Sequence, residues 1–205
     1  MFAIVESGSI TSMPRGNKGV QIGDVKHPAD IFTAKWTESE RNAIGVYTIE
    51  IDNTNFKDEE YYINTSITYA FGSGKVTGTY GTATAKPHAD TTYTNTDKSN
   101  GDIPTGKNVG DVKEEGLKTV LIRQVKRKAQ EILNETDWYI TRNAEKSTAI
   151  PSAITTHRDA VRTKQASMET AITNAADAPA LETLYTYTTT DGVTSRPLGE
   201  LPTLE

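Results

Sequence analysis

The stretch VGDVKEEGLKTVLIRQVKRKAQEILN, residues 109–134, decides the fold of the second half of the chain. Its apolar residues recur every three or four positions, a pattern typical of a helix with one buried face. Acidic residues lie near its start and basic residues nearer its end, where both suit the helix dipole. We therefore expect a helix over residues 109–134. The apolar stripe consists of Leu117, Val120, Leu121, Val125, Ala129, Ile132 and Leu133.

A second helix is expected from about Ser152 to Ala176, because apolar residues recur there every seven positions. These residues are Ile154, Val161, Met168 and Ala175. The intervening segment, Asn134 to Pro151, is too short for another domain. Residues 109–176 are therefore expected to form an antiparallel helical hairpin. The alternative use of the same seam is a homotrimeric coiled coil.

Residues 1–87 read as a β-rich domain. The segment from Val46 to Ile51 alternates between two faces, which predicts a half-buried strand. Residues 61–71 and 76–83 are rich in Tyr, Ile and Thr and flank a Gly-Ser-Gly-Lys turn, which predicts a hairpin. The first half of the chain is therefore predicted to be a sheet.

The remaining segments complete an α+β fold. A capping box formed by Thr37 and Glu40 should begin a short helix that ends near Gly45. Residues 88–108 carry almost no large apolar group and read as a linker or long loop. Residues 177–205 contain three prolines and read as an extended or weakly strand-forming tail, whose leucines and tyrosines need a surface to lie on.

Composition favours a protein that works through surfaces over a densely packed enzyme. Only 35% of the residues are hydrophobic, the mean hydropathy is -0.54, and threonine is abundant. The net charge of -5 and the pI near 5.3 give no general reason to expect nucleic acid as a partner. One basic run, residues 123–128, reads as a solvated helix face in preference to a phosphate site.

Cysteine content and hydropathy exclude further classes. The chain has no cysteine, so disulfides, zinc-thiolate sites and thiol nucleophiles are impossible. No apolar run approaches the about 18–20 residues that cross a bilayer, so no membrane is expected. The N-terminal Met-Phe-Ala-Ile-Val-Glu-Ser does not resemble a signal peptide, so we expect synthesis in a cytoplasm.

No pattern of catalytic residues emerges from the sequence. The three histidines lie in unrelated contexts, and no G-x-S-x-G elbow is present. The acidic patch of residues 52–60 lacks the spacing of an EF-hand, so a solvated loop is favoured over a surface calcium site. The glycine-rich run 72–78 lies between two strands and reads as a turn, not a phosphate loop. We expect neither enzyme activity nor a cofactor or metal.

One cluster, Thr136 to Arg142, combines Asp, Trp, Tyr and Arg between the two predicted helices. A Trp-Tyr pair at this place commonly plugs the end of a helical hairpin, with Asp137 capping a turn. The alternative is an exposed aromatic and arginine anchor for a partner protein, because interface hot spots favour these residue types.

The same region resembles the back half of phage tail-fibre assembly and tail-assembly chaperone proteins, which carry a T-D-W motif followed by a proline and a helix with paired arginines. The resemblance covers about residues 117–172, and Trp36 to Tyr47 is similar to a phrase near the start of some such proteins from marine phages. The motif residues are Leu133, Thr136, Asp137, Trp138, Arg142, Glu145, Ile150, Pro151, Arg158 and Arg162. The candidate partner-binding residues are Trp138, Tyr139, Arg142, Arg158 and Arg162.

The resemblance implies a part of a bacteriophage tail. The threonine-rich front and the segment after residue 177 are additions to that family's pattern, and they suggest a subunit that stays in the particle as a fibre, baseplate or adaptor component. Its partners would be other tail proteins and further copies of itself, with a trimer as one option. It would reside in the virion tail, and in the host cytoplasm during assembly.

Two alternatives stay open at this point. The first is a transient chaperone that helps tail fibres to assemble and then leaves. The second is a glycan hydrolase acting on the host surface, which would need two carboxylates about 5–10 Å apart in a cleft.

Overall fold

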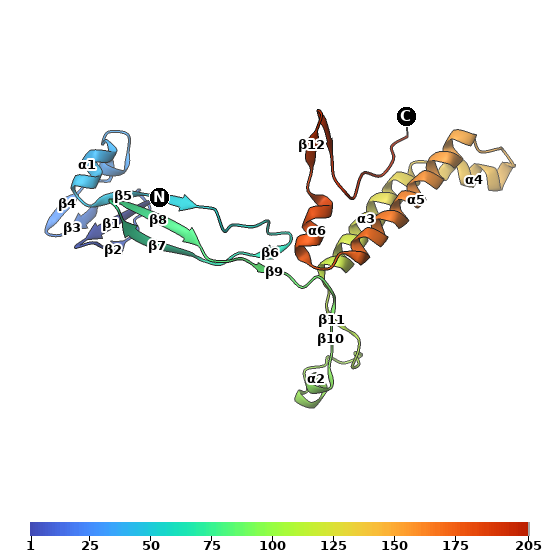
Figure 1. Cartoon of the computed structure of the whole chain (residues 1–205), viewed down its shortest axis with the longest axis horizontal. Coiled ribbons are helices and arrows are strands. Elements are labelled where there is room, and N and C mark those ends of the chain that lie inside the picture. The colour runs from blue at the N-terminus through green and yellow to red at the C-terminus, as the bar shows by residue number, and fades with distance from the viewer. Residues whose placement is uncertain (205) are drawn as a thin grey trace. The chain divides into compact units, whose positions relative to one another are not determined.

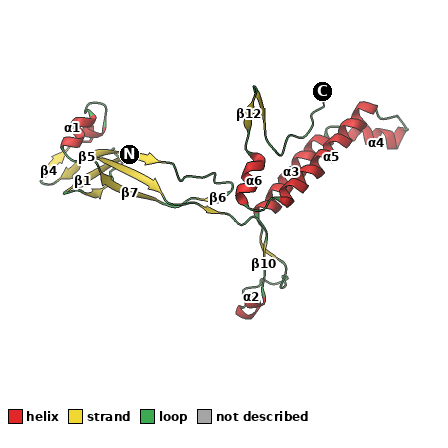
Figure 2. Ribbon diagram, viewed as in Figure 1, coloured by secondary structure: helices red, strands yellow, loops and turns green. Residues whose placement is uncertain are grey.

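The computed structural model describes residues 1–204 and divides the chain into two compact units, residues 1–84 and the residues from Ala85 onward (Figure 1). The first unit is built mainly from strands, and the second is dominated by helices (Figure 2). The α+β fold predicted from the sequence is confirmed. Each unit is described by itself below.

The first unit contains nine complete or partial strands and two short helical segments. In chain order they are β1 (Phe2–Glu6), β2 (Ser9–Ser12), β3 (Val20–Ile22), β4 (Val25–His27), a 3-10 helix (Ala29–Phe32), α1 (Glu38–Ala43), β5 (Val46–Asp52), β6 (Tyr62–Ile63), β7 (Ile67–Gly72), β8 (Lys75–Tyr80) and β9 (Thr84–Ala85).

Five of these strands form one sheet in the order β2-β1-β5-β8-β7. All neighbours are antiparallel except β5 and β8, which are parallel. The edge strands β2 and β7 also contact each other, so the sheet is nearly closed. The strands enclose a small core whose buried members are Ala3, Val5, Ile49 and Val76.

The outer face of this sheet is covered too, which the alternation along β5 did not reveal. Val46 is 0% exposed and packs with Ile4 and Ile31, the latter from the 3-10 helix. On the other face of β5, Ile49 is 7% exposed and Ile51 is 41% exposed. Each face of the strand therefore contributes one buried residue, Val46 and Ile49, to a different core cluster.

Two local features predicted for the first unit, a capping box and a hairpin turn, are confirmed. The Thr37 hydroxyl accepts the Glu40 N–H at 3.3 Å, and the Glu40 carboxylate accepts the Thr37 N–H at 2.7 Å, so the predicted capping box begins α1. Gly45 follows the helix at φ +81°, and a Cβ there would lie 2.6 Å from the Val5 carbonyl oxygen. Ser73-Gly74 forms the predicted turn between β7 and β8, with φ of 52° and 76°.

The second unit contains a helix pair and smaller appended elements. In chain order they are β10 (Thr91–Thr92), α2 (Asn95–Asn100), β11 (Val112–Glu114), α3 (Leu117–Asn134), α4 (Asp137–Lys146), α5 (Ser152–Asn174), α6 (Ala178–Tyr185), β12 (Thr188–Thr190) and β13 (Val193–Ser195).

The predicted antiparallel pairing of the two long helices is confirmed. Near one end the Lys118 ammonium donates to the Thr173 carbonyl at 2.8 Å, and near the other the Arg158 guanidinium donates to the Leu133 carbonyl at 2.7 Å. The heptad residues Ile154, Val161, Met168 and Ala175 are all buried, at 6%, 0%, 4% and 8% exposure. The seam serves an intrachain contact between α3 and α5.

The first helix starts later than its predicted position at residue 109. Residues 112–114 form β11, which pairs with β10, and α3 begins after Gly116. A Cβ at Gly116 would lie 2.3 Å from the carbonyl carbon of Ala89, so only glycine allows this close passage of two backbones. Residues 112–114 are therefore paired in a strand, and the helix begins only at Leu117.

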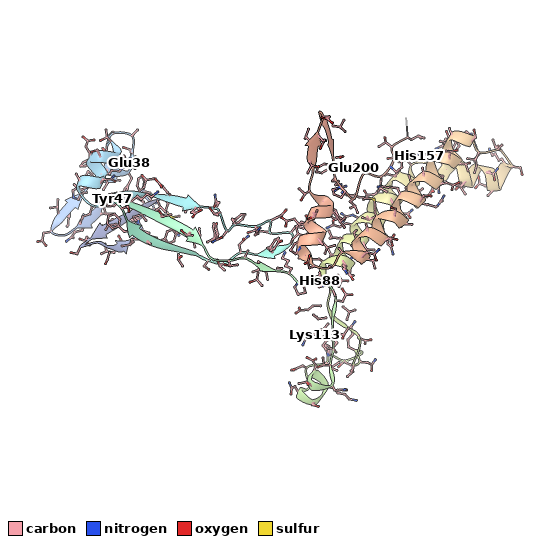
Figure 3. All side chains as sticks on the ribbon, viewed as in Figure 1. Glu38, Tyr47, His88, Lys113, His157 and Glu200 are labelled. Atoms are coloured by element: carbon pink, nitrogen blue, oxygen red, sulfur yellow. The ribbon has the colours of Figure 1, made fainter. Side chains whose placement is uncertain are left out.

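The segment read as a linker, residues 88–108, holds β10 and α2 and forms an arm with β11. Thr94 and Asp97 make a second capping box at the start of α2. Asp97 also pairs with Lys113 at 2.6 Å, which ties the two sides of the arm together (Figure 3). Hydrogen bonds among polar side chains order this arm in place of a hydrophobic core.

The segment from residue 177 onward, expected to be extended, first forms helix α6. Asp177 accepts the Ala180 N–H at 2.8 Å, and Pro179 lies in the first turn, where proline favours a helix start. Three leucines of this segment are buried or packed against apolar neighbours, whereas Leu204 is 45% exposed. Leu181 and Leu198 are 0% and 2% exposed, and Leu201 packs on a cluster formed by α3 and α5.

Candidate partner-binding site at the end of the helix pair

The predicted cluster lies where α3 ends and α4 begins. The backbone turns at Thr136, whose N–H and hydroxyl both donate to the Leu133 carbonyl, at 3.1 and 3.0 Å. Thr136 is only 3% exposed, although it is polar. The turn carries the chain directly into α4, a helix that the sequence patterns did not predict.

Arg158, from the first half of α5, holds this turn through contacts with three of its residues. Its Nη1 donates to the Leu133 carbonyl and to the Thr136 hydroxyl, both at 2.7 Å, and its Nη2 lies 2.8 Å from an Asp137 carboxylate oxygen. Arg158 is 7% exposed, and its neighbour on α5, His157, is 8% exposed. We call the group of Thr136, Asp137 and Arg158 the corner lock.

The corner lock is favourable at both helix ends that it joins. The Leu133 carbonyl lies in the last turn of α3, where carbonyls lack helical partners and the dipole favours a cation. Asp137 opens α4, where the dipole favours an anion. The guanidinium therefore suits the end of α3, the Asp137 carboxylate suits the start of α4, and the ion pair between them links α3, α4 and α5.

The aromatic residues that follow form a stack on α4. The rings of Trp138 and Tyr139 lie 3.7 Å apart between centroids, at an interplanar angle of 30°. The Arg142 guanidinium lies over both rings, 4.7 Å from the Trp138 centroid and 5.3 Å from the Tyr139 centroid. Trp138 is 51% exposed. We call these three residues the aromatic stack, a rigid surface that combines apolar area with a positive charge.

The five predicted residues therefore divide into three groups. Trp138, Tyr139 and Arg142 come together as the aromatic stack. Arg158 is buried against Leu133, Thr136 and Asp137, so it positions the start of α4 and is not part of the exposed surface. Arg162 lies one turn further along α5, is half exposed, and pairs with Asp159 at 3.4 Å.

Both interpretations of the cluster have a counterpart in the structure. Arg158 binds Thr136 and Asp137 at this end of the helix pair, which fits the structural interpretation. The expected plug, the Trp138-Tyr139 pair, is only partly buried, because half of the Trp138 surface faces solvent. The aromatic stack is therefore exposed for contact with a partner, whereas the corner lock holds the local structure.

A cavity of about 340 Å³ between α3, α5 and the C-terminal segment is a feature that sequence reasoning missed. Its apolar lining includes Val125, Ile132, Met168 and Leu201. These residues come from three segments far apart in sequence, so no local pattern brings them together. The only sequence signal is the leucine content of the C-terminal segment.

Beside this cavity, Arg196 lies between two tyrosine rings, 5.2 Å from the Tyr185 centroid and 5.1 Å from the Tyr187 centroid. Glu200 accepts from Arg196 at 2.8 Å and from the Tyr187 hydroxyl at 2.5 Å (Figure 3). The hydrogen bond to the Glu200 carboxylate raises the pKa of Tyr187 above its usual value. Through these contacts, the segment that follows β13 is held against the segment that precedes β12.

In the acidic patch of residues 52–60 and the basic run of residues 123–128, several charged side chains bind nearby protein groups. Asp52 accepts from the N–H and hydroxyl of Thr54, which lower the pKa of its carboxyl, and Asp58 accepts the Glu60 N–H at 2.8 Å. Within residues 1–204, no three His, Asp or Glu side chains are grouped as metal ligands would be. In the basic run, Lys126 lies 3.3 Å from Glu169 and Arg127 lies 3.9 Å from Glu131.

Among the described residues, no helix combines the length and the apolar character needed to cross a membrane. Comparisons with known proteins add no relative: no family model, no curated protein and no solved structure matches the chain.

Proposed function

We propose that this chain is a structural protein of a bacteriophage tail, a fibre, baseplate or adaptor subunit that acts through protein-protein contacts and not through catalysis. Its partners are other tail proteins and further copies of itself, and its place is the virion tail after assembly in the host cytoplasm. Nucleic acid and membrane have no part in this role.

The observation that carries the proposal is the amount of exposed surface. The chain exposes 13174 Å². A compact monomer of this mass exposes about 9,400 Å², and two separate compact proteins sharing the same mass would expose about 11,000 Å². The excess remains even when the two units are counted separately. Surface that folding does not bury is available for burial against other subunits.

The aromatic stack supplies a specific contact within that surface. Tryptophan and arginine are over-represented among the residues that dominate binding energy, and they act best when their conformations are fixed in advance. The corner lock fixes the helix that carries them. The stack therefore suits a docking role in which little conformational freedom is lost on binding.

The assignment to a phage tail comes from the resemblance of residues 117–172. Thr136, Asp137 and Arg158, which belong to the family-like motif, meet in one hydrogen-bonded group. Their meeting supports treating the separated motif residues as one unit.

The test is the protein content of purified virions from lysates in which this chain is produced. We expect mass spectrometry to find the chain in the particles, and its absence from them would refute the structural role. Replacing Trp138 by Ala should reduce incorporation. The matched control is Ile140→Ala on the same helix, which removes a side chain that is 42% exposed and outside the stack.

The alternative, a transient tail-fibre assembly chaperone, is favoured by the fact that the resembling family includes such chaperones. Co-expression with the fibre protein separates the two roles. A chaperone increases the yield of soluble fibre and is missing from the purified fibre, whereas a tail subunit co-purifies with its neighbours.

A further inference from the structure

The hairpin formed by β12 and β13 stands beyond α6 without a covering layer (Figure 1). All six of its strand residues are exposed. Among the described residues, no third strand pairs with either of them. A lone two-stranded hairpin is only marginally stable in water, and a sheet of three or more strands is needed for independent stability.

The turn determines which backbone groups this hairpin leaves unpaired. Asp191 and Gly192 have φ of 52° and 78°, and Thr190 lies opposite Val193. A two-residue turn of this kind is closed by a hydrogen-bonded pair. The next pair, Thr189 and Thr194, is therefore a non-hydrogen-bonded pair, whose N–H and C=O groups point away from the hairpin. Their hydroxyl oxygens lie 2.8 Å apart, as expected for the closer side chains of such a pair.

The two outer edges differ in their protection against pairing. Natural sheets blunt open edges with charged side chains and prolines. The β13 edge runs directly into Arg196 and Pro197. The β12 side has no lysine, arginine or proline over residues 180–190. The open and unguarded edge is therefore that of β12.

We propose that β12 pairs antiparallel with β12 of a second copy of this chain, centred on Thr189, and so joins two hairpins into one four-stranded sheet. In this register Thr188 lies opposite Thr190 of the second copy, and Tyr187 lies opposite Asp191. No two like charges face each other. Opposed threonines repeat a pairing already present between Thr189 and Thr194.

This contact follows a two-fold axis, because each copy offers the same strand to the other. It predicts a dimer and not a trimer. The proposal does not depend on the tail assignment, and it uses a surface separate from the aromatic stack. Failure of one proposal therefore leaves the other intact.

The first test compares Thr189→Pro with Thr194→Pro in the full chain by sedimentation equilibrium at protein concentrations up to about 1 mM, the range of weak association. Either proline removes an outward N–H and no backbone hydrogen bond of the hairpin, a position at which edge strands accept proline. Both substitutions remove the same hydroxyl contact between residues 189 and 194, so the two variants are matched in that loss. We expect a concentration-dependent dimer of twice 22.4 kDa for the wild type and for Thr194→Pro, and a monomer for Thr189→Pro. A monomeric or trimeric wild type, or a Thr189→Pro variant that dimerises as the wild type does, would overturn the proposal.

The second test uses single cysteines, which the cysteine-free chain makes unambiguous. In the proposed register the two copies of residue 189 form a hydrogen-bonded pair with Cα atoms about 5.5 Å apart, within the range of a disulfide. The two copies of residue 194 would be separated by three strand spacings, about 14 Å. Thr189→Cys should form a covalent dimer in a glutathione redox buffer and Thr194→Cys should not. Equal crosslinking of both variants, or none for Thr189→Cys, contradicts the register.

Discussion

Replacing Arg158 by methionine tests whether the corner lock holds the helix pair in shape. Methionine keeps most of the length of the buried stem and removes the guanidinium. Three hydrogen bonds of 2.7, 2.7 and 2.8 Å are lost, two of them to Leu133 and Thr136, which are both buried.

The size of the effect follows from what remains after the guanidinium is removed. The Leu133 carbonyl keeps two donors from Thr136, and the side chain of Asp137, which is 49% exposed, regains water. No acceptor is therefore left stranded, and the larger penalty for an unpaired buried charge does not apply. A hydrogen bond to a charged group contributes about 1.5–3 kcal/mol net, and methionine recovers part of the total because it avoids the cost of burying a guanidinium. We expect a net loss of about 2–3 kcal/mol.

Urea denaturation followed by circular dichroism at 222 nm measures this loss, because every helix longer than six residues lies in the second unit. The control is Arg162→Met, one turn along the same helix, where the exposed side chain makes one 3.4 Å contact and a change within about 0.5 kcal/mol is expected. An Arg158→Met variant within 1 kcal/mol of the wild type, or equal effects at both positions, would refute the reasoning.

Three further outcomes are expected. Gly116→Ala should lower the free energy of unfolding of the second unit by at least about 2 kcal/mol in urea titrations, because the new Cβ would overlap the backbone of Ala89. The control is Gly72→Ala, which has open space around it and should leave the stability of the first unit nearly unchanged. Ile172→Ala should cost about 2–5 kcal/mol by the same assay, because this fully buried side chain would leave a cavity, and a smaller loss would mean that α3 and α5 close around it. The pKa of Asp97 is depressed by its bonds to Lys113 and to the cap of α2, so the arm should keep this stabilisation above the ordinary carboxyl pKa and lose it as pH falls through the depressed value. The measurement is the amide protection factor of residues 94–113, the exchange rate relative to the intrinsic rate at the same pH, and protection that is weaker at neutral pH than in strong acid would contradict this sign.

The sequence alone determined the features that depend on neighbours within a few positions. The capping box at Thr37, the turn at Ser73-Gly74 and the two long amphipathic helices follow from spacing and residue type, and all three are confirmed. The antiparallel pairing also followed, because a short connection leaves two apolar stripes little other choice. It also identified the cluster that contains the aromatic stack, since Trp138, Tyr139 and Arg142 are neighbours on one helix.

Tertiary structure decided the features that join distant residues. Arg158 was expected to contact a partner, but it is buried because the end of α3, 25 residues earlier, offers it a carbonyl and a hydroxyl. Proline content suggested an extended C-terminal segment, yet Leu181, Leu198 and Leu201 found apolar surface that only the packed helix pair provides. Local patterns fix backbone conformation within a turn or two, whereas burial depends on which surfaces the folded chain brings together, and that is set by contacts across the whole unit.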